Sequence, residues 1–263
     1  TEQAERVPIP PTPDVKAVVA GYQGRAALTE GEAFEPTPAN IESRVVRDAL
    51  PGGLKVTLLP KQSRGHEVHL TLTLRYGNEE NLKPLQTAAS FLPGLMLRGT
   101  QSLTYTQIRD ELNRLGASLT PGALPTGNRR GGGGNAGLGA LTFSIVARRD
   151  TLPAVLEILR QVLREPLLPA DYFEIQKAER IASLETNRTD PAALAPRLLA
   201  QTLSPYSPDD IRYVPTAEES IARLKATTHA QVVQLYRDYL GGREGELTIV
   251  GDFDAASSLP VLQ

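Results

Sequence analysis

The fold is decided by the stretch Thr87-Ala88-Ala89-Ser90-Phe91-Leu92-Pro93-Gly94-Leu95-Met96-Leu97-Arg98-Gly99-Thr100. Its apolar residues, together with Leu85, recur at helical spacing, so we expect a helix that buries one face against a sheet. A proline inside a helix removes one backbone hydrogen bond and costs about 3 kcal/mol. Pro93 should therefore kink or end this helix.

Three positions of this stretch stand one helical turn apart on a common side, and they hold Ser90, Pro93 and Gly94. A zinc-binding helix of the H-x-x-E-H type places two histidine ligands and a general base at such positions. A serine, a proline and a glycine cannot hold zinc in the usual way.

Composition sets broad limits on the class of protein. With 263 residues, 40% of them hydrophobic, the chain can form one large domain or two small ones. Its net charge of -2 argues against general binding of nucleic acids, because that requires a basic face. The absence of cysteine excludes disulfides and thiolate chemistry.

The chain ends give further expectations. No apolar run is long enough to span a bilayer, and the amino terminus has no signal-peptide core. A start at Thr1 suggests a piece of a longer chain. Residues 1–40 are rich in proline and are interpreted as a linker, residues 41–254 as one domain, and residues 255–263 as the start of a connection to a following domain.

Strands are expected first within the domain. They cover residues 44–48, 54–59 and 67–76, and the last alternates apolar and polar residues as a half-buried strand does. After a helix that begins at the capping box Thr104 to Gln107, two more strands are expected at residues 117–124 and 138–148. Residues 246–251 are predicted to close the core as a strand.

Helices fill most of the second half. One is expected from a cap at Asp150 to residue 165, a second over residues 169–187, and a third opening at Asp190. Two more begin at capping boxes, which start at Thr216 and Thr228.

Two of the three histidines, His66 and His69, form the sequence His-Glu-Val-His, which looks like a shortened zinc motif. The H-E-x-x-H motif needs its histidines one turn apart on a helix, whereas these are expected on a strand with their rings on opposite faces. We interpret them as polar residues at the edge of a strand. His229 stands at a predicted helix start and has no evident partner in the sequence.

A glycine-rich segment joins the strands expected at residues 117–124 and 138–148, and it contains a literal G-x-G-x-x-G from Gly132 to Gly137. A phosphate-binding loop must be followed by a helix, and here a strand follows, so dinucleotide binding is not expected. The segment is either an unconstrained insertion or a substrate-contacting loop. In the second case the contacting residues would be Arg129, Arg130, Gly132 and Gly133.

The order of the motifs resembles a known family. A turn Pro51-Gly52-Gly53 between two strands, a long strand ending at Arg75-Tyr76-Gly77-Asn78, the helix with Arg98-Gly99-Thr100, and a final strand ending at Val250-Gly251-Asp252-Phe253 occur in this order. The chain is similar over residues 41–254 to one repeat of the pitrilysin/insulinase zinc metallopeptidases, the inverzincins, which include the mitochondrial processing peptidase. The resemblance implies an α+β, LuxS/processing-peptidase-like metallohydrolase fold, with a largely antiparallel sheet and helices packed mainly on one face.

The same resemblance implies that the catalytic residues are lost. Ser90 stands for the first histidine ligand, Pro93 for the catalytic glutamate and Gly94 for the second histidine. The third ligand, a glutamate, would fall at Glu185 or, alternatively, at Glu179. One carboxylate cannot form the three-ligand site of a catalytic zinc, so no cofactor is expected in this chain.

Family architecture suggests the role of such a chain. Active members consist of two similar halves around a chamber, so this chain is expected to be the first domain of the non-catalytic half. Its partners would be peptide substrates and a zinc-bearing half, in the same polypeptide or in a separate subunit, and bacterial family members suggest the periplasm. Two other hypotheses stay open: an assembly domain that binds another protein, and an independent enzyme that uses His66, His69 and a carboxylate.

Overall fold

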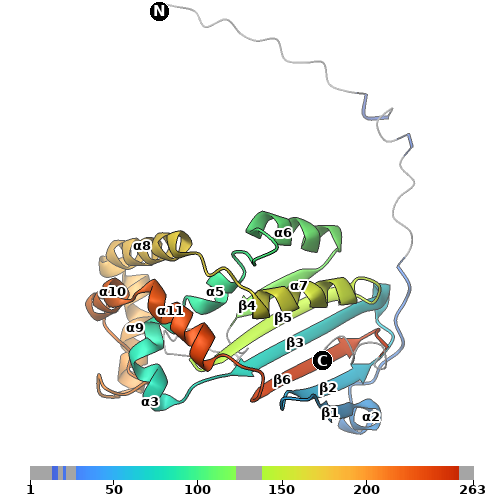
Figure 1. The fold of residues 1–263 in the computed structure, drawn as a ribbon, viewed down its shortest axis with the longest axis horizontal. Helices are drawn as coiled ribbons and strands as arrows, with labels where there is room; N and C mark the ends of the chain where they lie inside the picture. Colours follow the sequence, from blue (N-terminus) through green and yellow to red (C-terminus); the bar gives the residue numbers. More distant parts are fainter. Residues whose placement is uncertain (1–13, 17–19, 22–27, 123–137, 255–263) are drawn as a thin grey trace, which may run out of the picture.

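The computed structural model describes residues 14–16, 20–21, 28–122 and 138–254. These residues form a six-stranded sheet in the order β1-β2-β6-β3-β5-β4. The strands are β1 (Val46–Ala49), β2 (Lys55–Pro60), β3 (Glu67–Arg75), β4 (Ser118–Gly122), β5 (Ala140–Arg148) and β6 (Gly245–Gly251). Only the β2–β6 pair is parallel among these six, so the sheet is largely antiparallel (Figure 1).

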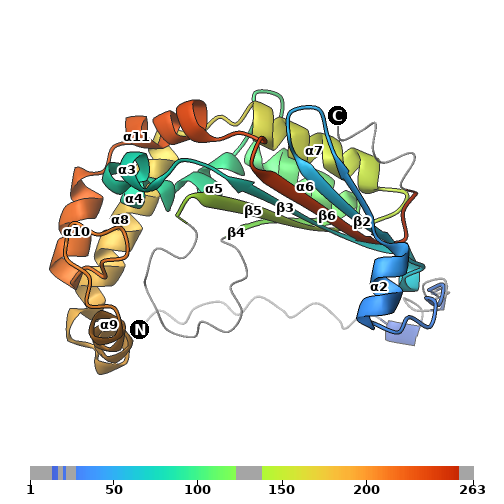
Figure 2. The same ribbon diagram turned by 90° about the horizontal axis from the view of Figure 1, so that it is seen from below.

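Most of the helices lie on one face of the sheet and beyond one of its ends, and α2 (Pro38–Arg44) lies at the opposite end. Figure 2 shows α5 (Leu92–Met96), α6 (Tyr105–Arg114) and α7 (Leu152–Arg164) over one face, while α8 (Ala170–Thr186), α9 (Pro191–Leu203) and α10 (Ala217–Ala226) lie past the end of the strands. The remaining helical segments are α2 (Pro38–Arg44), η1 (Arg64–His66), α3 (Glu79–Leu82), η2 (Lys83–Leu85), α4 (Gln86–Ala89), η3 (Asn187–Thr189), α11 (His229–Gln234) and the π-helical turn η4 (Leu235–Tyr239). The α+β fold class and the one-sided packing expected from the sequence are confirmed.

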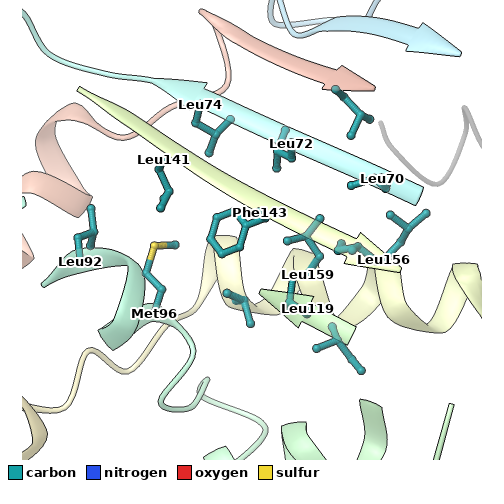
Figure 3. Packing of buried hydrophobic residues seen from close by; sticks show 14 of the residues in the cluster. Leu70, Leu72, Leu74, Leu92, Met96, Leu119, Leu141, Phe143, Leu156 and Leu159 are labelled. Atoms are coloured by element: carbon teal, nitrogen blue, oxygen red, sulfur yellow. The ribbon is translucent and has the colours of Figure 1, made fainter. Parts of the chain in front are cut away.

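The core lies between the sheet and these helices. Figure 3 shows Leu70, Leu72 and Leu74 of β3 beside Leu141 and Phe143 of β5. Beneath them, α7 contributes Leu156 and Leu159, and α5 contributes Leu92 and Met96; all of these side chains are buried. Burial of one such side chain stabilises the fold by about 1.5–3 kcal/mol, so the motif stretch is retained as part of the core.

The motif stretch is two short helices and not one. Helix α4 ends at Ala89, and α5 begins at Leu92 with Pro93 in its first turn. Ser90 and Phe91 donate backbone bonds to Thr87 and Ala88, so the chain tightens there. Because Pro93 has no N–H to donate to Ala89, the first helix cannot continue, as predicted from the proline.

Several local predictions are confirmed and two differ. The capping boxes at Thr104, Thr216 and Thr228 are present, and the Asp190 side chain caps α9. The prediction that Asp150 caps α7 is wrong, because the cap position is occupied by Thr151, whose side chain makes no capping bond.

The start of the domain also differs from the expectation. A strand was predicted from residue 44, whereas α2 extends to Arg44 and β1 begins at Val46. This helix is capped by the Thr37 side chain and has proline in its first turn. The capping threonine and the proline both lie in a proline-rich stretch, so in the sequence they could not be distinguished from a linker.

Candidate functional site

Helix α8 runs antiparallel to the motif stretch, and three of its residues contact Arg98, Gly94 and Ser90 of that stretch in register. Tyr172 accepts a hydrogen bond from Arg98, Gln176 lies against Gly94, and Arg180 binds Ser90. On α8 the spacing is four residues at each step, so the three side chains form one stripe along the helix. We call Tyr172, Gln176 and Arg180 the α8 stripe.

Arg180 lies directly on the first motif position. Its Nη1 donates to Ser90 Oγ over 2.7 Å and its Nη2 donates to the Ser90 carbonyl over 3.2 Å. The guanidinium also stacks on the Phe91 ring, with 3.9 Å between Cζ and the ring centroid. Burial lowers the pKa of the Arg180 guanidinium from its usual value. A positively charged guanidinium therefore lies against Ser90, the position at which the family resemblance implies a metal ligand.

Gln176 fills the space beside the third motif position. A Cβ atom built on Gly94 would lie 3.4 Å from Gln176 Nε2 and 3.6 Å from Oε1. The amide nitrogen donates to the Tyr172 hydroxyl over 3.3 Å, and the buried Oε1 has no hydrogen-bond partner among the described residues. A methyl group at position 94 would make ordinary contacts with this amide, whereas a larger side chain would need its space.

Arg98 closes the other end of the stripe. Its guanidinium lies between two tyrosine rings, 3.8 Å from the Tyr172 centroid and 4.3 Å from that of Tyr105. Stacking on aromatic faces and a bond to the Tyr172 hydroxyl hold it in one orientation.

These residues do not fit a catalytic zinc. Zinc requires imidazole, thiolate or carboxylate ligands, and the three motif positions offer a hydroxyl, a ring without a donor atom, and no side chain. The hydroxyl is already bonded to Arg180, whose charge would repel a divalent cation. In the described part of the chain, no group of three or more His, Asp or Glu side chains could hold a metal ion.

The glutamates considered as a third ligand lie elsewhere on α8. Glu179 and Glu185 are exposed, and they are about 100° and 140° around the helix from Arg180. The assignment of Glu185 as a remnant ligand stays a prediction. The loop residues Arg129, Arg130, Gly132 and Gly133 fall outside the described residues.

The histidines have separate partners. His66 ends η1 and is not part of a strand, because the backbone has positive φ at Gly65 and His66 before β3 begins. The expectation that His66 lies on a strand is therefore wrong. The His66 Nδ1 atom lies 2.6 Å from Asp252 Oδ2, and His69 Nε2 lies 2.6 Å from the Glu67 carboxylate. His229 Nε2 bonds the Leu168 carbonyl over 2.6 Å.

The sheet face opposite to the core carries a row of hydroxyl groups. The register aligns Thr57 of β2, Thr248 of β6, Thr71 of β3, Ser144 of β5 and Thr120 of β4 across five neighbouring strands. We call these five residues the hydroxyl row. Three of them are exposed and two are half-buried. Neighbouring members are about 4.8 Å apart, the spacing of strands in a sheet.

Comparison with solved structures agrees with the fold described above. No protein-family model matches the sequence, and no match was found among curated proteins. Among solved structures, the chain is similar to a peptidase M16 inactive domain from Pseudomonas fluorescens, with a TM-score of 0.65 and 18% identity. That alignment covers 82% of this chain and 48% of the other. The chain has the fold of an M16 peptidase domain.

Two further solved structures extend the comparison to longer proteins. The periplasmic protease PqqL from Escherichia coli aligns with a TM-score of 0.62 and 12% identity over 89% of this chain and 23% of its own. The ferredoxin protease FusC, solved in complex with Arabidopsis ferredoxin, aligns with a TM-score of 0.58 and 14% identity over 90% and 24%. The chain thus spans about half of the first relative and about a quarter of these two.

The sequence did not reveal the α8 stripe. Its residues lie some 80 positions beyond the motif, and a polar spacing of i, i+4, i+8 is common on exposed helices. The signal in the sequence was only that Tyr172, Gln176 and Arg180 recur every four residues, which places them on one face of a helix.

Proposed function

We propose that this chain is a non-catalytic peptidase-fold domain that forms part of the wall of a peptide-binding chamber. A catalytic half, which carries zinc on an intact H-x-x-E-H helix, lies opposite it, either in the same polypeptide or in a partner subunit. The parent or complex is then a zinc metalloendopeptidase, and the chain supplies substrate-binding surface without chemistry of its own.

The hydroxyl row carries this proposal. A hydroxyl both donates and accepts a hydrogen bond, so a row of five can pair with the N–H and C=O groups of many peptide sequences. Among the described residues no helix covers this polar sheet face, which suits a surface that contacts substrate and remains wet.

The comparisons support the same role at the level of the fold. One similar structure is described as an inactive domain, and another was solved with a protein bound to it. We further propose a periplasmic location, because a similar protease is described as periplasmic. In the part of the chain that the structure describes, no helix has the length and apolar character needed to cross a membrane.

The test is reconstitution with the zinc-bearing half. Cleavage of a fluorogenic peptide by that half should rise when the 263-residue chain is present. Replacing Thr71 and Thr248 by valine should raise KM several-fold with little change in kcat, since the hydroxyls bind substrate and do no chemistry. Ser43→Ala, an exposed change on α2, is the matched control. An unchanged KM in the double variant would contradict the role of the hydroxyl row.

A second function, assembly with another protein, is favoured by α9. None of its residues is buried, and Leu194, Leu198, Leu199 and Leu203 are 41 to 73% exposed. Exposed apolar helices of this kind often mark protein interfaces. If removal of the chain leaves peptide cleavage unchanged and disrupts only the complex, the assembly function replaces the chamber.

A further inference from the structure

Two arginines near the motif stretch have no anionic partner. Arg98 and Arg180 are half-buried, yet neither forms an ion pair with a carboxylate of the described residues. Ten of the sixteen other described arginines do form such pairs, for example Arg160 with Glu157 over 2.7 Å. Half-buried charges without a counter-charge are costly, so their retention needs a reason.

Both guanidiniums are also held in fixed positions. Arg180 is fixed by two bonds to Ser90 and by Phe91, and Arg98 by two tyrosine rings. An arginine has five N–H donors, and Arg180 uses only part of them in these bonds. A guanidinium that is fixed before binding loses little entropy when it binds an anion.

Polar groups between the two arginines complete the surface. Tyr172 offers a hydroxyl, and Gln176 lies between the two ends with an amide oxygen that is buried and unpaired. If this amide is turned over, its N–H₂ group takes that place and becomes a donor. No acidic residue belongs to the α8 stripe or to the three positions that face it, which are Ser90, Gly94 and Arg98.

We propose that the α8 stripe, together with Arg98 and Ser90, is a carboxylate-binding site that selects acidic peptides. The site deepens the proposed function and rests on it, since it names the class of substrate that the wall would hold. Carboxylates match the planar fork of arginine by accepting two parallel hydrogen bonds. A positive site thus replaces the metal centre of the catalytic domains and binds substrate without cleaving it.

The spacing of the two arginines sets the length of the preferred peptide. Tyr172 and Arg180 are eight residues apart on α8, which is about 12 Å along the helix axis. An extended peptide advances about 3.3 Å per residue, so two carboxylates four residues apart fit the two ends. A single carboxylate, from a side chain or from the peptide C-terminus, would bind at one end only.

The experiment measures binding of short peptides to the purified chain by NMR. The probes are acetyl-Glu-Ala-Ala-Ala-Glu-amide, its Gln-Ala-Ala-Ala-Gln counterpart, and acetyl-penta-alanine with a free or an amidated C-terminus. The diacidic peptide should bind at least about tenfold more tightly than the glutamine peptide and shift the Nε–H signals of Arg98 and Arg180. The free and amidated penta-alanines separate recognition of a C-terminus from recognition of side chains.

Variants identify the residues responsible. Arg180→Gln should reduce affinity for the diacidic peptide about tenfold, and Arg180→Lys should restore it only in part, because lysine cannot form the bidentate contact. Arg237→Gln is the control, since Arg237 is exposed and pairs with Asp238. Thermal unfolding of each variant confirms that it is folded. Equal binding of acidic and neutral peptides, or full affinity in folded Arg180→Gln, would overturn the proposal.

The test is separate from that of the proposed function because it needs no catalytic half. If the chain binds carboxylates through Arg180 but does not affect cleavage by the zinc-bearing half, the chamber role fails and the site stands. If the chain stimulates cleavage and shows no preference for acidic peptides, the site fails and the chamber role stands.

Discussion

Arg180 and Gln176 lie against Ser90 and Gly94, two of the three positions at which the family resemblance implies metal-site residues. Ser90 is short enough to accept a bond from Arg180 Nη1, and Gly94 leaves room for the Gln176 amide. Pro93 lies in the first turn of α5, and the preceding helix ends at Ala89. A histidine at position 90 or 94 would have to displace one of these α8 side chains. Ser90 and Gly94 therefore fit the α8 side chains that face them.

Substitutions at Gly94 test this packing. Gly94→His should lower the free energy of unfolding by about 1–3 kcal/mol, because the imidazole overlaps the space of Gln176. Gly94→Ala is the matched variant. Its Cβ makes ordinary contacts and alanine favours helix, so stability should be unchanged or higher by up to about 1 kcal/mol. Denaturant unfolding measures both, and a histidine variant as stable as the alanine variant would disprove the packing.

At the scale of elements, the sequence predicted several features that depend on neighbouring residues. It did not predict the features that depend on contacts between residues far apart in the chain. The alternation of β3 and the capping boxes at Thr104, Thr216 and Thr228 depend on neighbouring residues, and the structure has them as predicted. The break between α4 and α5 followed from Pro93 alone.

Two of the missed features have a common physical cause, and α2 was missed for a different reason. The α8 stripe depends on the antiparallel packing of two segments that are far apart in the chain, which no local pattern encodes. The hydroxyl row depends on strand register, since Thr57 and Ser144 become aligned only through β6 and β3. Helix α2 was missed because its cap and proline lie in proline-rich sequence.

The capping box of α10 gives this helix a dependence on pH. Glu219 accepts bonds from the Thr216 backbone N–H and from the Tyr213 hydroxyl, each at 2.8 Å, and these hold the pKa of its carboxyl below the usual value. A lowered folded-state pKa contributes stability above the unfolded pKa, which is about 4.3 for glutamate. That stability is lost as pH falls through the folded-state pKa.

Below about pH 4.5, the Glu219→Gln variant should therefore lose less unfolding free energy on acidification than the wild type does. Near pH 7 the dependence of the unfolding free energy on pH should be the same in both. Thermal unfolding between pH 3 and pH 7 measures it, with Glu179→Gln, an exposed change on α8, as the control. If wild type and Glu219→Gln lose stability in parallel on acidification, the carboxylate bonds of this box do not contribute.

The whole molecule has two surfaces of opposite character on either side of one sheet. One side is packed with leucines from α5 and α7, and the other presents the hydroxyl row, over which no helix of the described ranges lies. The chain spans about half the length of a similar solved inactive domain, so a larger protein of this fold has further surfaces to place opposite the row. The proposal of a chamber wall rests on this division.

The central claim is that a domain with the peptidase fold works without a catalytic metal. The most direct measurement is the zinc content of the purified chain after incubation with excess zinc and dialysis, with a peptidase assay on the same sample. The account predicts far less than one zinc per chain and no cleavage above the blank. One zinc per chain, together with cleavage that a chelator abolishes, would contradict it.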